Sequence, residues 1–206
     1  SIAIAAGRRP DQSLFGSIIQ HMQTQFKSVG IVGAGAMGRG IAQMAAQAGS
    51  QVILFDAQAD ASLRARAEIF SLWDKLLAKG RLESEQVAQY QSRLSCADTL
   101  EKLSGCDLIV EAIVERLDAK VGLFTALEAI VAHTTVLATN TSSLSVTAIA
   151  AGLKNAQRFA GLHFFNPVPL MKVVEVIAGL KTDDQGCDLL AHYVLQMGHT
   201  PVRASD

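Results

Sequence analysis

A histidine, an amide and a carboxylate stand close together between Gly161 and Glu175. His163 and Asn166 flank two phenylalanines, and Pro167 fixes the turn that follows. Because an imidazole titrates at about pH 6.5, His163 can accept a proton from an alcohol near neutral pH. We expect Glu175 to accept the other ring N–H, which would orient the imidazole and raise its proton affinity. The alternative is a core histidine beside an unrelated glutamate, but a core does not need the Asn-Pro turn.

A glycine motif, Gly33-Ala34-Gly35-Ala36-Met37-Gly38, lies far upstream of the histidine. Its first glycine allows a tight turn, the second lets the backbone approach a pyrophosphate, and the third lets a helix pack closely on a strand. Asp56 ends the next apolar segment, where its carboxylate can bind the ribose hydroxyls of NAD and repel the 2′-phosphate of NADP. The motif therefore predicts an NAD site. A plain turn and an FAD site are the alternatives, although nothing downstream is typical of a flavin enzyme.

A run of hydroxyl and amide side chains extends from Thr139 to Ser145, directly after an apolar segment. Ligands of open α/β sheets bind at the carboxyl ends of strands, so this run is well placed for a site. Ser142 can hydrogen-bond a reacting oxygen, while Ser145 caps the helix that follows. Turn and capping chemistry alone is the alternative.

Apolar segments alternate with amphipathic helical segments from residue 29 to residue 202, which predicts a doubly wound α/β domain of the Rossmann type with a mostly parallel sheet. The expected strands are 29–32, 51–56, 108–113, 135–139, 159–163 and 173–177, and the expected helices are 37–48, 117–132 and 183–196. Between Ala57 and Leu94, two charged helical patterns join around Gly80 and predict a protruding helical hairpin. We expect residues 28–206 to form one domain.

Composition argues against several other classes of protein. The 206 residues are half apolar, with 18 basic and 19 acidic residues and no basic run, so we expect no nucleic-acid partner. The longest uncharged stretch, 129–153, is broken by Thr, Asn, Ser and Gly, so we expect no membrane span. The three cysteines have neither metal-ligand nor redox spacing, which predicts reduced structural thiols, no metal site and a cytoplasmic location.

Residues 1–27 form an N-terminal leader in this interpretation. Its arginines follow the apolar stretch, which is the reverse of the charge order of a secretory signal. Apolar residues recur at helical spacing from Leu14 to Phe26. The leader is therefore either a short amphipathic helix or sequence foreign to the natural protein, which would then start at Met22.

Four motifs, taken in order, resemble those of the 3-hydroxyacyl-CoA dehydrogenases. They are the glycine motif, Val110-Glu111-Ala112-Ile113-Val114-Glu115, Asn140-Thr141-Ser142-Ser143 and His163-Phe164-Phe165-Asn166-Pro167. The resemblance runs from about Ser28 to Asp206 and is strongest to bacterial enzymes for 3-hydroxybutyryl-CoA or 3-hydroxyadipyl-CoA. It implies oxidation of the 3-hydroxy group of an acyl-CoA to a 3-oxoacyl-CoA, with NAD as cofactor and His163 as general base.

The resemblance also implies roles for single residues. The implied catalytic residues are His163, Glu175, Ser142 and Asn166. The implied cofactor contacts are Gly33, Gly35, Met37, Gly38, Asp56, Glu115 and Lys120, together with Ser142 and Asn166 beside the nicotinamide. The helical extension of the family touches coenzyme A, which implies that cations of the hairpin face its phosphates. These cations are Arg66, Lys75, Lys79 and Arg81.

Chains of this family continue beyond the position of Asp206 into a mostly helical domain that covers the substrate, supplies a further asparagine and forms the dimer. The resemblance thus implies a homodimer and a chain that is part of a longer protein. Two other functions stay open: a non-catalytic NAD-binding module and a dehydrogenase of small hydroxy acids. The intact His163, Glu175 and Ser142 speak against the first, and Asn166-Pro167 speaks against the second.

Overall fold

The structure is a computed structural model that describes residues 25–206. The leader helix predicted within residues 1–27 lies almost wholly outside the described residues. The strands are β1 (Ser28–Val32), β2 (Gln51–Phe55), β3 (Leu94–Cys96), β4 (Leu108–Glu111), β5 (Val136–Thr139), β6 (Phe159–Phe164), β7 (Val173–Ala178) and β8 (Thr200–Ser205). The α-helices are α2 (Ala36–Gln47), α3 (Ala61–Ala78), α4 (Ser84–Arg93), α5 (Leu117–Ile130), α6 (Val146–Ala150) and α7 (Asp184–Gln196).

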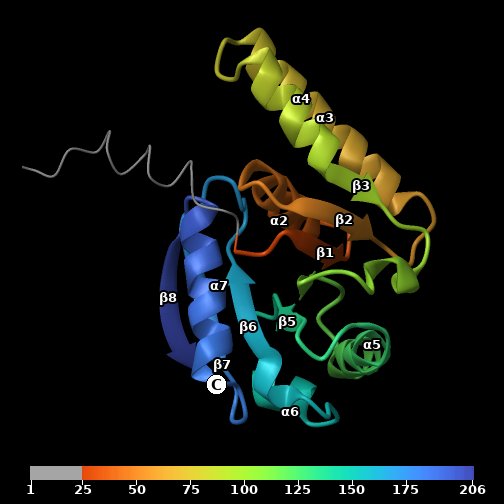
Figure 1. Ribbon diagram of the computed structural model, residues 1–206, viewed down its shortest axis with the longest axis vertical. Helices are drawn as coiled ribbons and strands as arrows, with labels where there is room; N and C mark the ends of the chain where they lie inside the picture. The colour runs from red at the N-terminus through yellow and green to blue at the C-terminus, as the bar shows by residue number, and fades with distance from the viewer. Residues whose placement is uncertain (1–24) are drawn as a thin grey trace, which may run out of the picture.

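In the described part of the chain the strands form one eight-stranded sheet in the order β3-β2-β1-β4-β5-β6-β7-β8 (Figure 1). The pairs from β3 to β6 are parallel, β7 is antiparallel to β6, and β8 is parallel to β7. The strand order reverses between β1 and β4, and α/β sheets of this kind bind ligands in the crevice at that point. The predicted Rossmann-type fold is confirmed.

Apolar side chains cover both faces of the sheet. One core cluster joins the sheet to α2, α3, α4 and α7, with Trp73 and Tyr193 among its fully buried side chains. The other cluster joins the opposite face to α5 and α6 through Phe124 and Phe159, whose rings meet edge to face at 4.6 Å. Parallel strands covered on both faces read as continuous apolar runs, which is why these segments were recognisable in the sequence.

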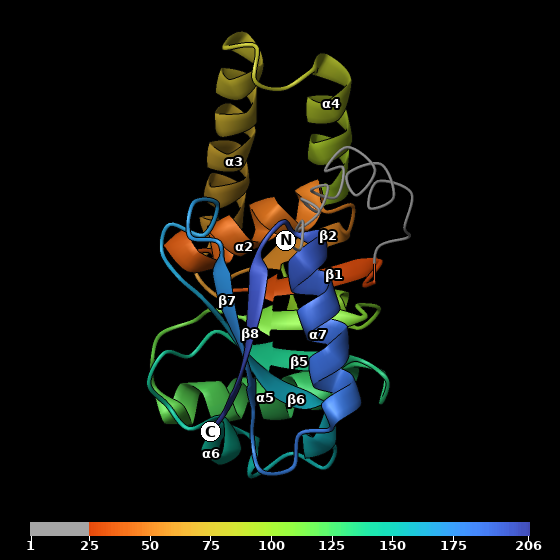
Figure 2. The same cartoon turned by 90° about the vertical axis from the view of Figure 1, so that its left-hand side faces the viewer.

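The predicted helical hairpin is present as α3 and α4, which project together from the body of the domain (Figures 1 and 2). Gly80 adopts a φ of 66° just after α3, a conformation that side chains other than glycine rarely adopt. Trp73 packs between Phe70 and Tyr90 at the base of the pair. The hairpin therefore has an aromatic core of its own that continues into the main one.

Three features of the sheet were not predicted, and one of them is the last strand, β8. The segment at Leu94 carries too weak a pattern to indicate a strand, because β3 is only three residues long. The direction of β7 was also not assigned. The loop between Phe164 and Val173 is shorter than the dozen or so residues of a parallel crossover, so β7 must run antiparallel to β6. No helix in residues 25–206 has the length and apolar character needed to cross a membrane.

Candidate active site

His163 and Glu175 occupy directly opposite positions on the antiparallel strands β6 and β7. Nδ1 of His163 lies 2.7 Å from Oε2 of Glu175. The two side chains are 15% and 37% exposed, so the pair is partly shielded from water but still reachable. A carboxylate can only accept a hydrogen bond, so Nδ1 of His163 carries the proton and donates it to Glu175 as a hydrogen bond. The lone pair of the neutral imidazole is then at Nε2, where a substrate hydroxyl can meet it.

Two further contacts hold the histidine in place. The ring of Phe165 lies 4.5 Å from the imidazole, centroid to centroid, at an interplanar angle of 50°. The side-chain oxygen of Asn140, which follows β5, accepts the backbone N–H of Phe164 at 2.8 Å. Neither role was assigned from the sequence, although both residues lie inside the motifs. They fix the ring and the end of β6 against the neighbouring strand.

One cavity of about 320 Å³ gathers most of the predicted catalytic residues. It lies at the carboxyl ends of β4, β5 and β6 and reaches the first turn of α2. The lining includes Met37, Glu115, Asn140, Ser142, His163 and Asn166. Glu175 stands behind His163 rather than in the lining. Segments that are distant in the sequence thus meet at one edge of the sheet.

The glycine motif forms a tight turn between β1 and α2. Gly33 has a φ of 105°, and a Cβ at Gly38 would come within 1.7 Å of the carbonyl oxygen of Gly33. A Cβ at Gly35, in contrast, would meet no atom within 4 Å. The backbone is therefore closed on the side of the sheet and open in front of the N-terminus of α2, where amide groups lack helical partners and favour an anion.

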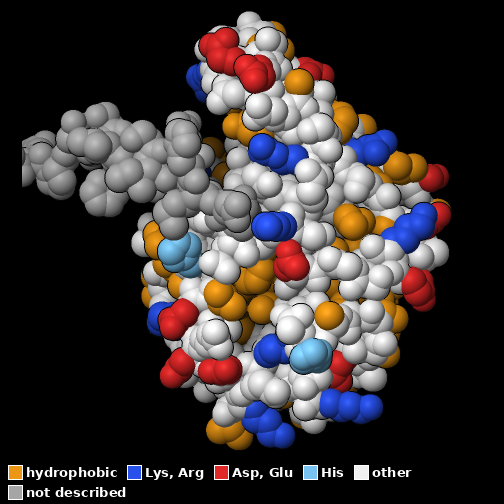
Figure 3. All heavy atoms as spheres, in the orientation of Figure 1, with side chains coloured by type: hydrophobic (Ala, Val, Ile, Leu, Met, Phe, Trp, Pro, Cys, Tyr) orange, Lys and Arg blue, Asp and Glu red, His pale blue; other side chains and the backbone are white. Residues whose placement is uncertain are grey.

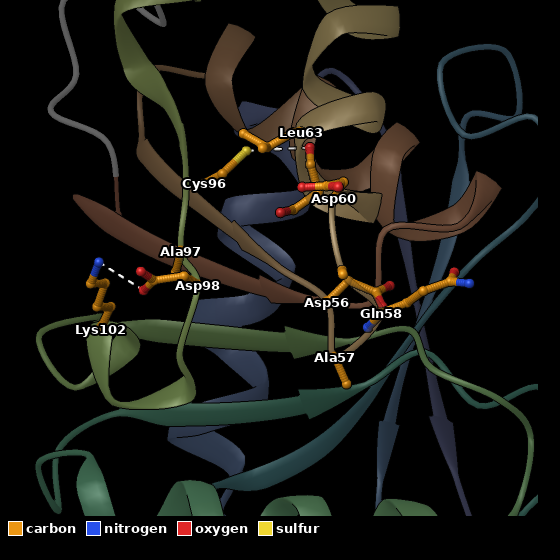
Figure 4. Close-up of a pocket in the computed structure, with 11 residues that line it drawn as sticks. Asp56, Ala57, Gln58, Asp60, Leu63, Cys96, Ala97, Asp98 and Lys102 are labelled. Carbon is orange, nitrogen blue, oxygen red and sulfur yellow. Dashed lines mark hydrogen bonds and ion pairs between the residues drawn. The ribbon is translucent and has the colours of Figure 1, made fainter.

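A second cavity, of about 450 Å³, lies beside the end of β2 (Figure 4). Asp56 lines it, and its two carboxylate oxygens accept the amides of Ala34 at 2.7 Å and Gln58 at 2.8 Å. A carboxylate has about four acceptor positions, so hydroxyl groups of a ligand can still be bound. Asp98 and Lys102 form a 2.7 Å ion pair at the rim. The glycine turn lies between this cavity and the first.

Glu115 organises the loop that carries Ser142. Its Oε1 accepts the hydroxyl of Thr141 at 2.5 Å and the amides of Ser142 and Ser143 at 3.0 and 3.2 Å. Partial burial would raise the pKa of Glu115, but the hydrogen bonds from Thr141 and Ser142, together with Lys120, lower it to about 2. The side chain is therefore a fixed anion at the edge of the cavity.

Lys120 is an expected cofactor contact, and in this structure its ammonium lies between two carboxylates. Its Nζ lies 2.5 Å from Glu111 and 3.2 Å from Glu115, and its side chain is only 1% exposed. Neither cavity includes Lys120 in its lining. Glu111 was not predicted as a partner, although a carboxylate at the end of an apolar strand signals a buried charge that needs one.

Comparison with known proteins agrees with this geometry along nearly the whole described chain. The model of the family "3-hydroxyacyl-CoA dehydrogenase, NAD binding domain" matches residues 28–206. The chain belongs to this family. It is 42% identical to 3-hydroxyadipyl-CoA dehydrogenase of Escherichia coli K12 over 88% of its length, but spans only 38% of that relative. It is 38% identical to 3-hydroxybutyryl-CoA dehydrogenase of Bradyrhizobium diazoefficiens, covering 86% of the chain and 60% of the relative.

Solved structures of the family have the same fold. The crystal structure of (S)-3-hydroxybutyryl-CoA dehydrogenase from Ralstonia eutropha superposes with a TM-score of 0.84 at 37% identity. The match covers 88% of this chain and 64% of that one. The chain thus spans less than two thirds of these relatives.

NAD is the cofactor of this family domain, and the geometry of the chain fits it. A Cβ at Gly35, at the start of α2, would meet no atom within 4 Å, so the backbone there is open to the close approach of a pyrophosphate. The two cavities on either side of the turn can take the two nucleoside halves. Asp56 lies in the cavity on the β2 side, and Ser142 and His163 lie in the cavity on the β4 side.

The four hairpin cations do not all lie on one face of the hairpin. Arg66 and Lys75 are nine residues apart on α3, which is about half a turn out of phase, so they point to opposite sides. The guanidinium of Arg66 lies 5.9 Å from the centre of the Phe70 ring. Lys75 lines a hollow of about 350 Å³ together with Arg39 and Glu68, which form an ion pair. Lys79 and Arg81 are exposed near the tip, where acidic side chains also gather (Figure 3).

Replacing Glu115 by glutamine is expected to make the free energy of unfolding decrease less as the pH falls. The pKa of Glu115 is lowered from 4.5 to about 2, so its charge stabilises the fold above pH 4.5 and this contribution is lost as pH falls toward 2. Because the side chain is 36% exposed, screening limits the contribution to about 1–2 kcal/mol. The free energy of unfolding, measured with urea, should differ more between the two proteins at pH 6 than at pH 3. An equal difference at both pH values would contradict the claim that the charge of Glu115 stabilises the fold.

Proposed function

We propose that the full-length protein oxidises the 3-hydroxy group of a 3-hydroxyacyl-CoA to a 3-oxoacyl-CoA with NAD, in a reversible reaction. The observation that carries this proposal is the His163–Glu175 pair, which opens into the same cavity as Ser142 and Asn166 beside the N-terminus of α2. That arrangement supplies a base for a hydroxyl proton next to the space for a dinucleotide. The names of its relatives, which act on CoA esters, support the acyl-CoA class.

Each side chain has a defined task in this reaction. Nε2 of His163 takes the hydroxyl proton as the C3–O bond becomes a carbonyl, and Glu175 stabilises the imidazolium that forms. The hydroxyl of Ser142 hydrogen-bonds the reacting oxygen, and Asn166 lines the same cavity. Bound NAD supplies the acceptor for the hydride that leaves C3. The proton and hydride together balance the oxidation.

Asp56 is our proposed determinant of cofactor choice. Its carboxylate lines the cavity on the β2 side, where the adenosine half would lie. It can accept hydrogen bonds from the ribose hydroxyls and would repel the 2′-phosphate of NADP. Asp60 lines the same cavity and adds to that repulsion, whereas Asp98 is paired with Lys102, which also lines the cavity.

The CoA contacts, the oligomeric state and the location of the protein are also proposals. Of the four hairpin cations, we propose Lys75 as a phosphate contact, because it lines a surface hollow in which the other cation, Arg39, is already paired with Glu68. A homodimer in the cytoplasm is the expected state of the complete protein. Light scattering after size-exclusion chromatography of that protein would measure its mass and test the dimer.

The decisive experiment mixes the full-length protein with NADH and either acetoacetyl-CoA or free acetoacetate. We expect NADH absorbance to fall with the thioester and to stay constant with the free acid. Equal rates on both would favour a small hydroxy-acid dehydrogenase instead. Binding of NADH without turnover of either compound would favour a non-catalytic NAD-binding module.

A further inference from the structure

The buried carboxylate of Glu111 connects the sheet to the loop that carries Ser142. Its side chain is fully buried at the end of β4, where no substrate or cofactor atom can reach it directly. We infer that Glu111 is a positioning residue that, through Lys120 and Glu115, fixes the 140–143 loop and with it the hydroxyl of Ser142. The relevance of that loop to catalysis rests on the proposed function.

Glu111 is fully engaged on the side of the sheet. One carboxylate oxygen accepts the amide of Ile113 at 2.7 Å and the ammonium of Lys120 at 2.5 Å. The other oxygen accepts the hydroxyl of Thr139, at the end of β5, at 2.7 Å. Three donors, from the ends of β4 and β5 and from α5, therefore fix the orientation of the carboxylate. The carboxylate in turn fixes the position of the buried ammonium.

Lys120 transmits this position to the loop. Its Nζ also lies 3.2 Å from Oε2 of Glu115, while the other oxygen of Glu115 holds the amides of Ser142 and Ser143. The contacts thus run from Glu111 through Lys120 and Glu115 to the loop, alongside a second link in which the hydroxyl of Thr139 accepts the amide of Thr141 at 3.3 Å. Removing the ammonium would leave Glu115, whose side chain is partly exposed, held only by hydrogen bonds from the loop itself and no longer tied to Glu111.

Stability alone does not account for this buried pair. Replacing a buried ion pair by apolar groups of similar shape is often neutral or stabilising, whereas removing one partner leaves a costly unpaired charge. A pair kept only for packing could therefore be exchanged for neutral side chains without effect on the loop. If the pair positions Glu115, the same exchange should loosen the loop, and an experiment can distinguish the two outcomes.

The test compares three variants of the full-length protein with the unmodified protein. Glu111→Gln removes the anion, and Glu111→Gln/Lys120→Met removes both charges with little change in shape. Tyr193→Phe is the control, since it removes a buried hydrogen bond to Ser50, remote from the 140–143 loop. Hydrogen exchange of the Ser142 and Ser143 amides and the Kd for NADH are measured for each. Neither measurement depends on turnover, so a failure of the proposed dehydrogenase activity would not be mistaken for a failure of this inference.

The double variant should recover the exchange protection of the core strands while the Ser142 and Ser143 amides lose about tenfold in protection, as expected when charge-assisted hydrogen bonds weaken. Its Kd for NADH should rise, and Tyr193→Phe should leave both loop amides unchanged. Unchanged loop protection and Kd in the double variant would overturn the inference and leave the pair a packing element. Equal loosening of the loop in Tyr193→Phe would overturn it as well. If Glu111→Gln does not fold, the double variant decides alone.

Discussion

Replacing His163 by glutamine in the full-length protein is expected to lower kcat for a 3-hydroxyacyl-CoA by about 10²–10⁴-fold, the usual size of general-base catalysis. A glutamine amide can still donate to Glu175 but cannot take up the proton of the substrate. The glycine turn and the Asp56 cavity are untouched, so the Kd for NADH should stay within about twofold. Steady-state rates and a fluorescence titration with NADH measure the two quantities separately.

The control for this prediction is His192→Gln, which changes an exposed histidine on α7 away from the cavity. Its kcat should equal that of the unmodified protein. The kcat of Glu175→Gln should lie between those of His163→Gln and His192→Gln. This variant keeps the base but loses the charge that stabilises the imidazolium. Undiminished turnover in His163→Gln would show that another group takes the proton.

Much of this site could be predicted from the sequence, because its residues lie close together along the chain or recur with the period of a strand or helix. The glycine turn, the strand before it and Asp56 after the next strand form one continuous βαβ unit. His163 and Glu175 are joined by a short loop, so antiparallel pairing brings them face to face. In both cases the covalent connection nearly determines the spatial contact.

The network behind Ser142 was not readable in the same way. The family resemblance implies that Lys120 contacts the cofactor, and it gave no sign that the ammonium lies between Glu111 and Glu115. Which way a long side chain turns depends on the packing of α5 against the ends of β4 and β5, and periodicity does not report that packing. The arrangement of the hairpin cations was likewise not predictable. A charged residue on a helix indicates an exposed face, but not whether that face lies near the other cations.

The glycine turn makes the second large prediction, because two of its glycines differ sharply in surroundings. Gly38→Ala is expected to lower the free energy of unfolding by about 3 kcal/mol or more, since the new Cβ would lie 1.7 Å from a backbone oxygen that no side-chain rotation can move. Either α2 or the β1 end must shift. Urea unfolding of the full-length protein measures the loss, and NADH binding should fail with it.

Gly35→Ala is the matched comparison, because the same methyl group would point into open space in front of α2. Gly35 has a φ of −69° and a ψ of −172°, which alanine adopts without strain, so stability should change by no more than about 0.5 kcal/mol. The methyl group would occupy the space needed for close approach of the pyrophosphate, and the Kd for NADH should rise at least about tenfold. A stable Gly35→Ala protein with unchanged NADH affinity would place the pyrophosphate elsewhere. The two substitutions thus separate a glycine that the fold requires from one that the cofactor requires.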